Sequence, residues 1–315
     1  MSKASPGPFF EDFELGAMLP CPPARQIGQS MRTMYEALTG DRTPSTLSSH
    51  GPTHPLIVFH TVLSQTVRPV SLNARANLGY AELICHRPVG LGATLTTEAE
   101  VVGLRETSSR QTGIVWVRTT GRDRQGPVIS YVRWVMVKKR APDTATPWRG
   151  GGAVVPTTAE VVDAADLPPA PLVTAVDVTG PWFLGDYTVG EVLDHPDGQL
   201  VAEADHMAFT RLFGNSARVH FDPATTADGR LLVFGGYTMS VGYSQALEGL
   251  GNRQGLLAIN AGRHTAPVHA GDTLRSQSEV IAVAPEAQAL RLALRVRNQA
   301  DEQVLELDYW ERMPS

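Results

Sequence analysis

The feature that most constrains this chain is an internal repeat, because motifs of its first half return in the same order in its second half. Asp12-Phe13-Glu14-Leu15-Gly16 is matched 174 positions later (186 − 12) by Asp186-Tyr187-Thr188-Val189-Gly190. The same offset (212 − 38) relates Leu38-Thr39-Gly40-Asp41 to Leu212-Phe213-Gly214-Asn215. Pro88-Val89 and Pro267-Val268 follow at an offset of 179 (267 − 88), and each precedes a Gly-x-Thr-Leu segment. Ordered matches at nearly constant offsets predict two diverged copies of one fold.

A boundary between the copies is visible in the composition. Residues 141–180 are rich in Pro, Ala and Gly and have no sustained hydrophobic periodicity, which is typical of a linker. We therefore expect an N-terminal repeat at 1–140, a linker at 141–180 and a C-terminal repeat at 181–315.

Each repeat has the same expected order of elements. A short helix is predicted at 31–38 and at 206–213, and a long apolar central helix at 56–63 and at 239–250. Antiparallel hairpins are predicted from 113–120 with 128–137 and from 290–297 with 304–310, because apolar and polar residues alternate there. Leu290, Leu292, Leu294 and Val296 would face the core. Helices followed by antiparallel strands, twice, indicate an α+β chain.

The charge pattern argues against a nucleic-acid-binding protein, because the net charge of the 315 residues is −5 and the 27 basic residues are scattered. The run Lys138-Lys139-Arg140 is interpreted as the solvated end of a strand. No apolar run approaches the roughly 20 residues of a membrane helix. Residues 1–8 lack the layout of a signal peptide, so a cytoplasmic protein is expected.

Metal binding is also not expected. Cys21 and Cys85 are too far apart in sequence to suggest a metal or disulfide pattern, and are interpreted as free core thiols. His50 and His54 have helical spacing, but Pro52 and Pro55 would break a helix there. With no third ligand nearby, this pair is not taken as a metal site.

Two segments resemble the MaoC-like family of (R)-specific enoyl-CoA hydratases and dehydratases. Residues 9–16, Phe-Phe-Glu-Asp-Phe-Glu-Leu-Gly, look like the opening of its domains. Residues 212–220 lie where the family carries Gly-Asp-x-Asn-Pro-x-His, and here Asn215 and His220 have the spacing of its Asp and His. The resemblance implies a double hot-dog fold, in which each repeat wraps an antiparallel sheet around a long central helix.

Within that family the chain is most similar to the mesaconyl-CoA hydratase (β-methylmalyl-CoA dehydratase) group. The similarity is carried by Ser71-Leu-Asn-Ala, Asn77-Leu-Gly-Tyr-Ala81, Tyr131-Val-Arg-Trp-Val-Met-Val137, Asn215-Ser-Ala-Arg-Val-His-Phe221, Gly235-Gly236 and Ile259-Asn-Ala-Gly-Arg-His-Thr265. It implies reversible hydration of an enoyl-CoA thioester, foremost mesaconyl-CoA to β-methylmalyl-CoA. Residues 42–55 are short for the group, Tyr237 stands in place of a His and Asp222 in place of an Asn, which leaves the acyl group open.

The chemistry of such a hydration points to His220. A neutral imidazole takes or gives a proton near neutral pH, whereas the Asn215 amide can only orient water. Asp222 or Asp41 remains a possible source of a carboxylate. By the repeat offset Asp41 is the counterpart of Asn215, and Thr46 stands where the second repeat has His220. The first repeat is therefore expected to hold a degenerate site.

Substrate-binding residues follow from the same resemblance. Gly236 matches the glycine whose backbone N–H faces the thioester oxygen in the family, at a helix N-terminus that favours negative charge. A second carboxylate on the acyl group would need a cation, for which Arg218 and Arg263 are the candidates, with Arg42 behind them. His264, Tyr237 and Asp41 are expected to contact the substrate.

Other functions remain open at this stage. The chain could hydrate another branched or short acyl-CoA, and the missing motif carboxylate favours a non-catalytic acyl-CoA-binding protein. A thioesterase is a further alternative on the same fold. No resident cofactor and no metal are expected, since the acyl-CoA would be the substrate. A homodimer is plausible, although two repeats could also satisfy each other within one chain.

Overall fold

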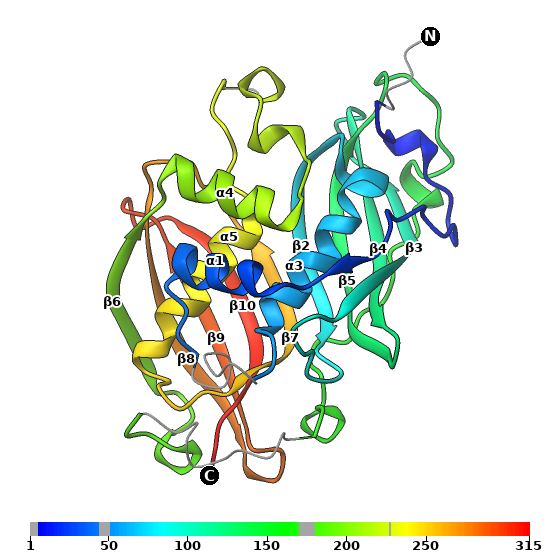
Figure 1. The fold of residues 1–315 in the computed structure, drawn as a ribbon. Helices are drawn as coiled ribbons and strands as arrows, with labels where there is room; N and C mark the ends of the chain where they lie inside the picture. Colours follow the sequence, from blue (N-terminus) through cyan, green and yellow to red (C-terminus); the bar gives the residue numbers. More distant parts are fainter. Residues whose placement is uncertain (1–5, 44–50, 170–179, 227) are drawn as a thin grey trace.

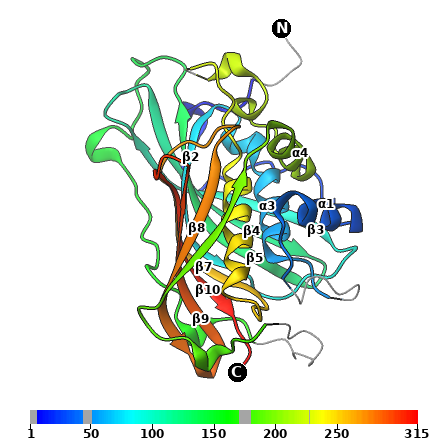
Figure 2. The same cartoon turned by 90° about the vertical axis from the view of Figure 1, so that its left-hand side faces the viewer.

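A single antiparallel sheet with helices on one face organises the chain in the computed structural model, which describes residues 6–43, 51–169, 180–226 and 228–315. The sheet has ten strands in the order β1-β3-β4-β5-β2-β7-β10-β9-β8-β6. Helices α1, α3, α4 and α5 lie together in front of it (Figure 1), and the turned view shows the strands and the helices as two layers (Figure 2).

The two repeats contain corresponding elements. The first comprises β1 (Arg25–Gln26), α1 (Gln29–Thr39), α3 (Pro55–Gln65), β2 (Ala74–Ile84), β3 (Thr94–Glu106), β4 (Thr112–Asp123) and β5 (Gly126–Lys138). The second comprises β6 (Val192–Leu200), α4 (Glu203–Phe213), α5 (Gly235–Gln245), β7 (Gly255–His264), β8 (Thr273–Ala284), β9 (Ala289–Arg297) and β10 (Gln303–Arg312). This order supports the division at 1–140 and 181–315, which we propose as the extent of the repeats.

The half-sheets have the same strand order and meet at β2 and β7. Reading outward from that seam gives β2-β5-β4-β3-β1 in one direction and β7-β10-β9-β8-β6 in the other. Antiparallel pairing of Tyr80 with Gly262 and of Ala81 with Ala261 joins the halves. No helix among the described residues is long and apolar enough to cross a membrane.

Most of the expected elements are confirmed. The two hairpins are β4–β5 and β9–β10, and Leu290, Leu292, Leu294 and Val296 are all buried. The expected length of the second central helix is wrong, because α5 begins at Gly235, earlier than predicted, and ends at Gln245 before a 3-10 turn. The central helices are also no longer than α1 and α4, since each of the four has 11 residues.

The repeated glycines have a backbone reason. Gly40 and Gly214 end α1 and α4 in the left-handed conformation, with φ of 72° and 74°. Glycine takes this conformation without the steric cost that a Cβ adds. The other matched pairs, Gly16 with Gly190 and Gly92 with Gly271, also have positive φ. The glycines that repeat in the sequence therefore occupy turns whose positive φ favours glycine.

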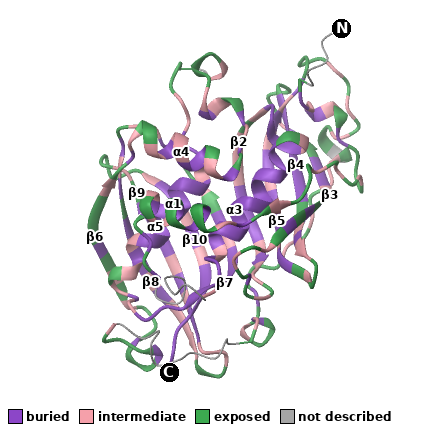
Figure 3. Cartoon of the chain, in the orientation of Figure 1, coloured by how far each residue is buried: buried purple, intermediate pink, exposed green. Residues whose placement is uncertain are grey.

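Helices α3 and α5 form the centre of the core. All residues of α3 after Pro55 are buried, as are those of α5 from Gly236 to Ser244, and Figure 3 shows both as largely buried ribbons. A helix that is apolar all round is buried, and these two helices also bury polar side chains, among them His60, Ser240 and Ser244. Where the two helices meet, His60 Nε2 and Ser240 Oγ are 2.8 Å apart.

The segment between the repeats packs on the opposite face of the sheet. Val162 and Leu167 join a buried cluster with Leu257 and Trp310. The Trp310 indole N–H donates to the Val162 carbonyl over 3.0 Å. The predicted linker is therefore partly a structural cover, and residues 170–179 of it lie outside the described part of the chain.

The basic run at the end of β5 is not simply a solvated strand end, as its sequence suggested. Lys139 is buried, and its ammonium lies 3.2 Å from the Glu106 carboxylate and donates to two backbone carbonyls. Arg140 is exposed and pairs with Asp12. Cys21 and Cys85 are free thiols, as expected, and burial raises the pKa of Cys85 to about 12.

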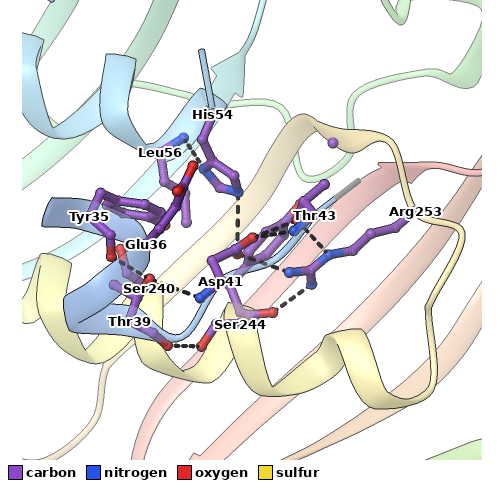
Figure 4. Close-up of polar contacts among 12 residues, drawn as sticks. Tyr35, Glu36, Thr39, Asp41, Thr43, His54, Leu56, Ser240, Ser244 and Arg253 are labelled. Atoms are coloured by element: carbon purple, nitrogen blue, oxygen red, sulfur yellow. Dashed lines mark hydrogen bonds and ion pairs between the residues drawn. The ribbon is translucent and has the colours of Figure 1, made fainter. Parts of the chain in front are cut away.

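A buried ion pair links the repeats (Figure 4). Arg253 Nη2 lies 3.0 Å from Asp41 Oδ2, and both side chains are at most 1% exposed. Arg253 Nε also donates to the Thr43 hydroxyl over 3.1 Å, and His54 Nε2 lies 3.4 Å from the same carboxylate. Burial alone would raise the pKa of Asp41, but His54 and Arg253 lower it below its ordinary value. Asp41 is therefore ionised and already paired.

We predict that Arg253→Met destabilises the protein by about 3–5 kcal/mol, because Asp41 then remains as a buried carboxylate without its cation. Denaturant unfolding at pH 7 measures the change. Arg295→Met, which removes a half-exposed partner of Glu279, is the control and should cost no more than about 1 kcal/mol. Equal losses in both variants would contradict the role given to the buried pair.

Candidate functional site

A cavity of about 370 Å³ lies between the repeats, on the helix side of the β2–β7 seam. The second repeat contributes the polar side chains of Asn215, His220, Thr238 and His264 and the backbone of Gly235 to its lining. The first repeat contributes Ser71, Arg75, Asn77, Tyr80 and Arg133. Apolar side chains such as Leu63, Val67, Val219, Phe234 and Val268 complete the wall. A mostly apolar pocket with a few convergent polar groups is the usual form of a small-molecule site.

His220 is held in one tautomer. It ends the 3-10 turn Arg218–His220, and its Nδ1 lies 2.7 Å from the Leu232 carbonyl oxygen. A carbonyl only accepts, so Nδ1 carries the proton and Nε2 keeps its lone pair. Burial lowers the pKa of His220 to about 4, although the bond to Leu232 opposes this shift. At neutral pH the cavity therefore contains a neutral imidazole that can accept a proton.

Asn215 is oriented by the turn that follows α4. Gly214 ends the helix, and Asn215 Oδ1 accepts the backbone N–H of Ala217 over 3.0 Å. This bond assigns the side-chain oxygen to the turn and leaves the Nδ2 group as the donor available to the cavity. Asp41 makes the same turn in the first repeat, with Oδ1 accepting the N–H of Thr43 over 2.8 Å.

The N-terminus of α5 closes one side of the cavity. The N–H groups of Gly235 and Gly236 precede the first intrahelical bonds, and no side chain caps them. Gly235 lines the cavity, and a Cβ there would lie 2.5 Å from the His264 ring, which fills that space. Gly236 lies behind it, where a Cβ would come within 2.8 Å of the His60 ring. The missing side chain at Gly235 thus makes room for the His264 ring, and of the two glycines Gly235 lines the cavity.

His264 is a second neutral imidazole in this wall. Its Nε2 lies 3.3 Å from the Tyr80 hydroxyl across the β2–β7 seam. Burial lowers its pKa to about 4. The Tyr80–His264 contact joins the walls that the two repeats contribute.

The two arginines expected to bind substrate are not brought into the cavity. Arg263 points to the other face of β7 from His264, with a side chain 67% exposed, and lies 3.9 Å from Glu306. Arg218 is exposed and donates to the Pro6 carbonyl and, weakly, to Asn73. Arg42, their alternative, is exposed in the first repeat. Arg263 points away from His264 because adjacent residues of a strand face opposite sides of the sheet. Arg218 lies in the same 3-10 turn as His220, but its guanidinium contacts Pro6 and Asn73.

Tyr237, Asp41 and Asp222 are also outside the cavity lining. The buried Tyr237 hydroxyl donates to the Leu38 carbonyl and accepts from Gln199. The Asp41 carboxylate forms an ion pair with Arg253. Asp222 is exposed, and its carboxylate accepts the Ala224 N–H and caps a 3-10 turn. None of these residues offers a carboxylate or hydroxyl to the cavity.

A smaller cavity of about 70 Å³ occupies the corresponding place in the first repeat. Pro55 begins α3 where Gly235 begins α5, and Cys85 stands where the 179-residue offset places His264. A proline has no N–H to offer at the helix N-terminus. No histidine is among the described residues that line it. Thr46, the counterpart of His220, lies outside the described residues, as does His50.

Residues without a predicted role also line the main cavity. Arg133, Asn77 and Tyr80 belong to segments that carried the family resemblance, but no function was assigned to them. The sequence does contain a signal for Arg133. Tyr131, Arg133 and Val135 are alternate residues of β5 that face inward, so Arg133 is a charged residue at an inward-facing strand position. Among the described residues, no group of three or more His, Cys, Asp or Glu could hold a metal ion.

Two curated proteins are similar to this chain over most of its length. It is 41% identical to mesaconyl-CoA hydratase of Cereibacter sphaeroides, with 99% of each chain covered. It is 39% identical to β-methylmalyl-CoA dehydratase of Chloroflexus aurantiacus, covering 89% of this chain and 84% of that one. No protein-family model matches the chain.

Solved structures agree with these relatives. A MaoC domain protein dehydratase from Chloroflexus aurantiacus has a TM-score of 0.92 and 35% identity, covering 100% of this chain and 99% of its own. A Mycobacterium tuberculosis protein described as a double hotdog fold has a TM-score of 0.78 and 27% identity, with 98% of each chain covered. The expected double hot-dog fold is confirmed.

The geometry at His220 predicts a measurable tautomer. Nitrogen-detected NMR of the imidazoles at pH 7 should show His220 protonated at Nδ1 only, with a titration midpoint near pH 4. The spectrum of His220→Gln assigns the signals. Observation of the Nε2–H tautomer, or of a midpoint near the ordinary value of 6.5, would contradict the assigned role as a base.

Proposed function

The chain belongs to the MaoC-like double hot-dog hydratase family, in the group of mesaconyl-CoA hydratase and β-methylmalyl-CoA dehydratase, and we propose that it catalyses the reversible hydration of mesaconyl-CoA to β-methylmalyl-CoA. It is accordingly a hydro-lyase. The observation that carries the proposal is the buried His220, whose Nδ1 proton is fixed by the Leu232 carbonyl inside a cavity that also contains Asn215 and the α5 N-terminus.

His220 acts as the base and then as the acid. Its Nε2 accepts a proton from water while the water oxygen bonds to the β-carbon of the enoyl thioester. The π electrons of the double bond move toward the thioester oxygen and form an enolate. The imidazolium returns the proton to the α-carbon as the enolate electrons form the new C–H bond, so atoms and charges balance. The lowered pKa of His220 makes its imidazolium a strong acid for this second step.

Asn215 positions the water. With Oδ1 engaged by Ala217 N–H, the Nδ2 group donates to the water oxygen and leaves the water protons directed to His220. No carboxylate is required in this arrangement, which differs from the Asp and His pair of the usual family motif.

The N-terminus of α5 stabilises the enolate. The N–H groups of Gly235 and Gly236 are the donors, and the helix dipole favours negative charge at that end. The neutral His264 ring lies in the same wall, with its Nε2 3.3 Å from the Tyr80 hydroxyl. The absence of a side chain at Gly235 lets the His264 ring lie against the helix end, beside these N–H groups.

The proposal also specifies partners and surroundings. Arg75 is exposed at the cavity and forms no ion pair with a described residue, so we assign it to the CoA phosphates. We propose that the reaction needs no resident cofactor and takes place in the cytoplasm. A homodimer is compatible with the fold, but one chain supplies both walls of the cavity.

The first test follows the loss of enoyl-thioester absorbance when the purified protein is mixed with mesaconyl-CoA. Turnover is expected, and His220→Ala should lower kcat by about 10²–10⁴-fold while the variant remains folded. Full activity in His220→Ala would remove His220 from the mechanism. Hydration of other enoyl-CoA esters only would support the alternative hydratase function, and thioester binding without reaction on any of them would favour the non-catalytic alternative.

A second test uses the difference between Asn215 and the carboxylate of the usual motif. The rate constant kcat/KM of the wild type should stay level as pH falls from 7 to 5, because its base titrates near pH 4. Asn215→Asp keeps the acceptor for Ala217 N–H and adds a negative charge near the imidazole, which favours its protonated form. Activity of Asn215→Asp should therefore begin to fall at a higher pH. Superimposable pH profiles would contradict the placement of residue 215 beside the base.

A further inference from the structure

Arg133 is a buried cation without an anion. It lies in β5, is 1% exposed and forms no ion pair with any described residue. Its Nη2 donates to the hydroxyl and the carbonyl of Thr66 over 2.8 and 3.4 Å, and its Nη1 makes a long contact of 3.5 Å with Asn77 Oδ1. Arg133 Nε and Asn77 Nδ2 have no hydrogen-bond partner in the described part of the chain.

Two other buried cations of the protein are paired. Arg253 lies 3.0 Å from the buried Asp41 carboxylate, and Lys139 lies 3.2 Å from the buried Glu106 carboxylate. An uncompensated charge is costly to bury, by several kcal/mol, and proteins usually pair it. Arg312 is also buried without an ion pair, but both of its terminal nitrogens donate to backbone carbonyls, those of Ala287 and Pro168. Arg133 is informative because it lines the cavity that contains His220 and Asn215.

The position of Arg133 relative to the reaction groups suggests what its partner is. Arg133, Asn77 and Tyr80 line the wall from the first repeat, whereas His220, Asn215 and Gly235 line the wall from the second. Tyr80 is the cross-strand neighbour of Arg133 and contacts His264. An acyl group whose thioester lies at the α5 N-terminus therefore directs its other end toward β2 and β5.

We propose that Arg133, with Asn77 as a second donor, binds a free carboxylate at the far end of the acyl group and so selects dicarboxylic acyl-CoA esters. This inference rests on the proposed hydration for its orientation of the acyl group. A guanidinium presents parallel N–H groups that match the two oxygens of a carboxylate, and their attraction is strong where water is excluded. The first repeat, which has the degenerate site, thus contributes the residues that select the substrate, and the second repeat contributes the residues that react with it.

The subsite is tested by binding alone. Succinyl-CoA and butyryl-CoA have acyl groups of similar size that differ in a terminal carboxylate, and neither has a double bond to hydrate. Calorimetric titration of the wild type should give at least about tenfold tighter binding of succinyl-CoA. Arg133→Met should abolish this ratio and leave the Kd of butyryl-CoA within about threefold. Arg263→Met, the matched control on the outer face of β7, should keep the wild-type ratio.

The possible outcomes separate the subsite from the reaction. The proposal is overturned if the wild type binds succinyl-CoA and butyryl-CoA with similar Kd values. It is also overturned if Arg133→Met keeps the preference for succinyl-CoA, or if Arg263→Met loses it. If Arg133→Met does not fold, Arg133→Lys keeps the charge without the planar fork and should lower the ratio at least about threefold. An unchanged ratio in Arg133→Lys then overturns it. If succinyl-CoA binds more tightly than butyryl-CoA through Arg133 but mesaconyl-CoA is not hydrated, the subsite is supported and the proposed reaction is rejected. If mesaconyl-CoA is hydrated but the two esters bind equally well, the reaction is supported and the subsite is rejected.

Discussion

The pairing of β2 with β7 is the interaction on which the remaining structure depends. Without it, each half-sheet would expose a long edge strand with unpaired backbone groups at the middle of the molecule. With it, ten strands form one surface, and α3 and α5 are buried side by side against it. The same seam places the β2 residues of one repeat beside the β7 residues of the other, so the cavity has a wall from each. Tyr80 and His264, from opposite sides of the seam, are in contact for this reason.

The repeats show how one turn can serve two purposes. Gly40-Asp41 and Gly214-Asn215 end their helices in the same conformation, and each following side chain accepts a backbone N–H two residues on. The Asp41 carboxylate also pairs with the Arg253 guanidinium and so stabilises the contact between the repeats. Asn215 has no charge to satisfy and faces the cavity. A proline in place of a glycine at the start of α3 completes the difference between the two sites.

Burial determines the electrostatics of the cavity. His220 and His264 are both kept neutral at physiological pH, because desolvation lowers the pKa of each to about 4. Fixed N–H donors at a helix end and a cation without a carboxylate partner lie in the same lining. Such an arrangement is complementary to an anion that enters with the ligand, and interactions of this kind are strongest where water is excluded.

The sequence by itself determined the repeat, the element order and the pair Asn215 and His220, because these depend on local patterns: glycines at obligatory turns, alternation along strands, and fixed spacing after a helix. Composition also predicted a linker at 141–180, but not the packing of Val162 against Trp310. Only the tertiary structure decided which side chains share the cavity. Arg218 and Arg263 are close to the histidines in sequence but point away from them, whereas Arg133 is distant in sequence and lines the same space. The physical reason is that strand pairing across β5, β2 and β7, together with the alternation of side-chain directions, sets these neighbours, and neither is visible in a single segment.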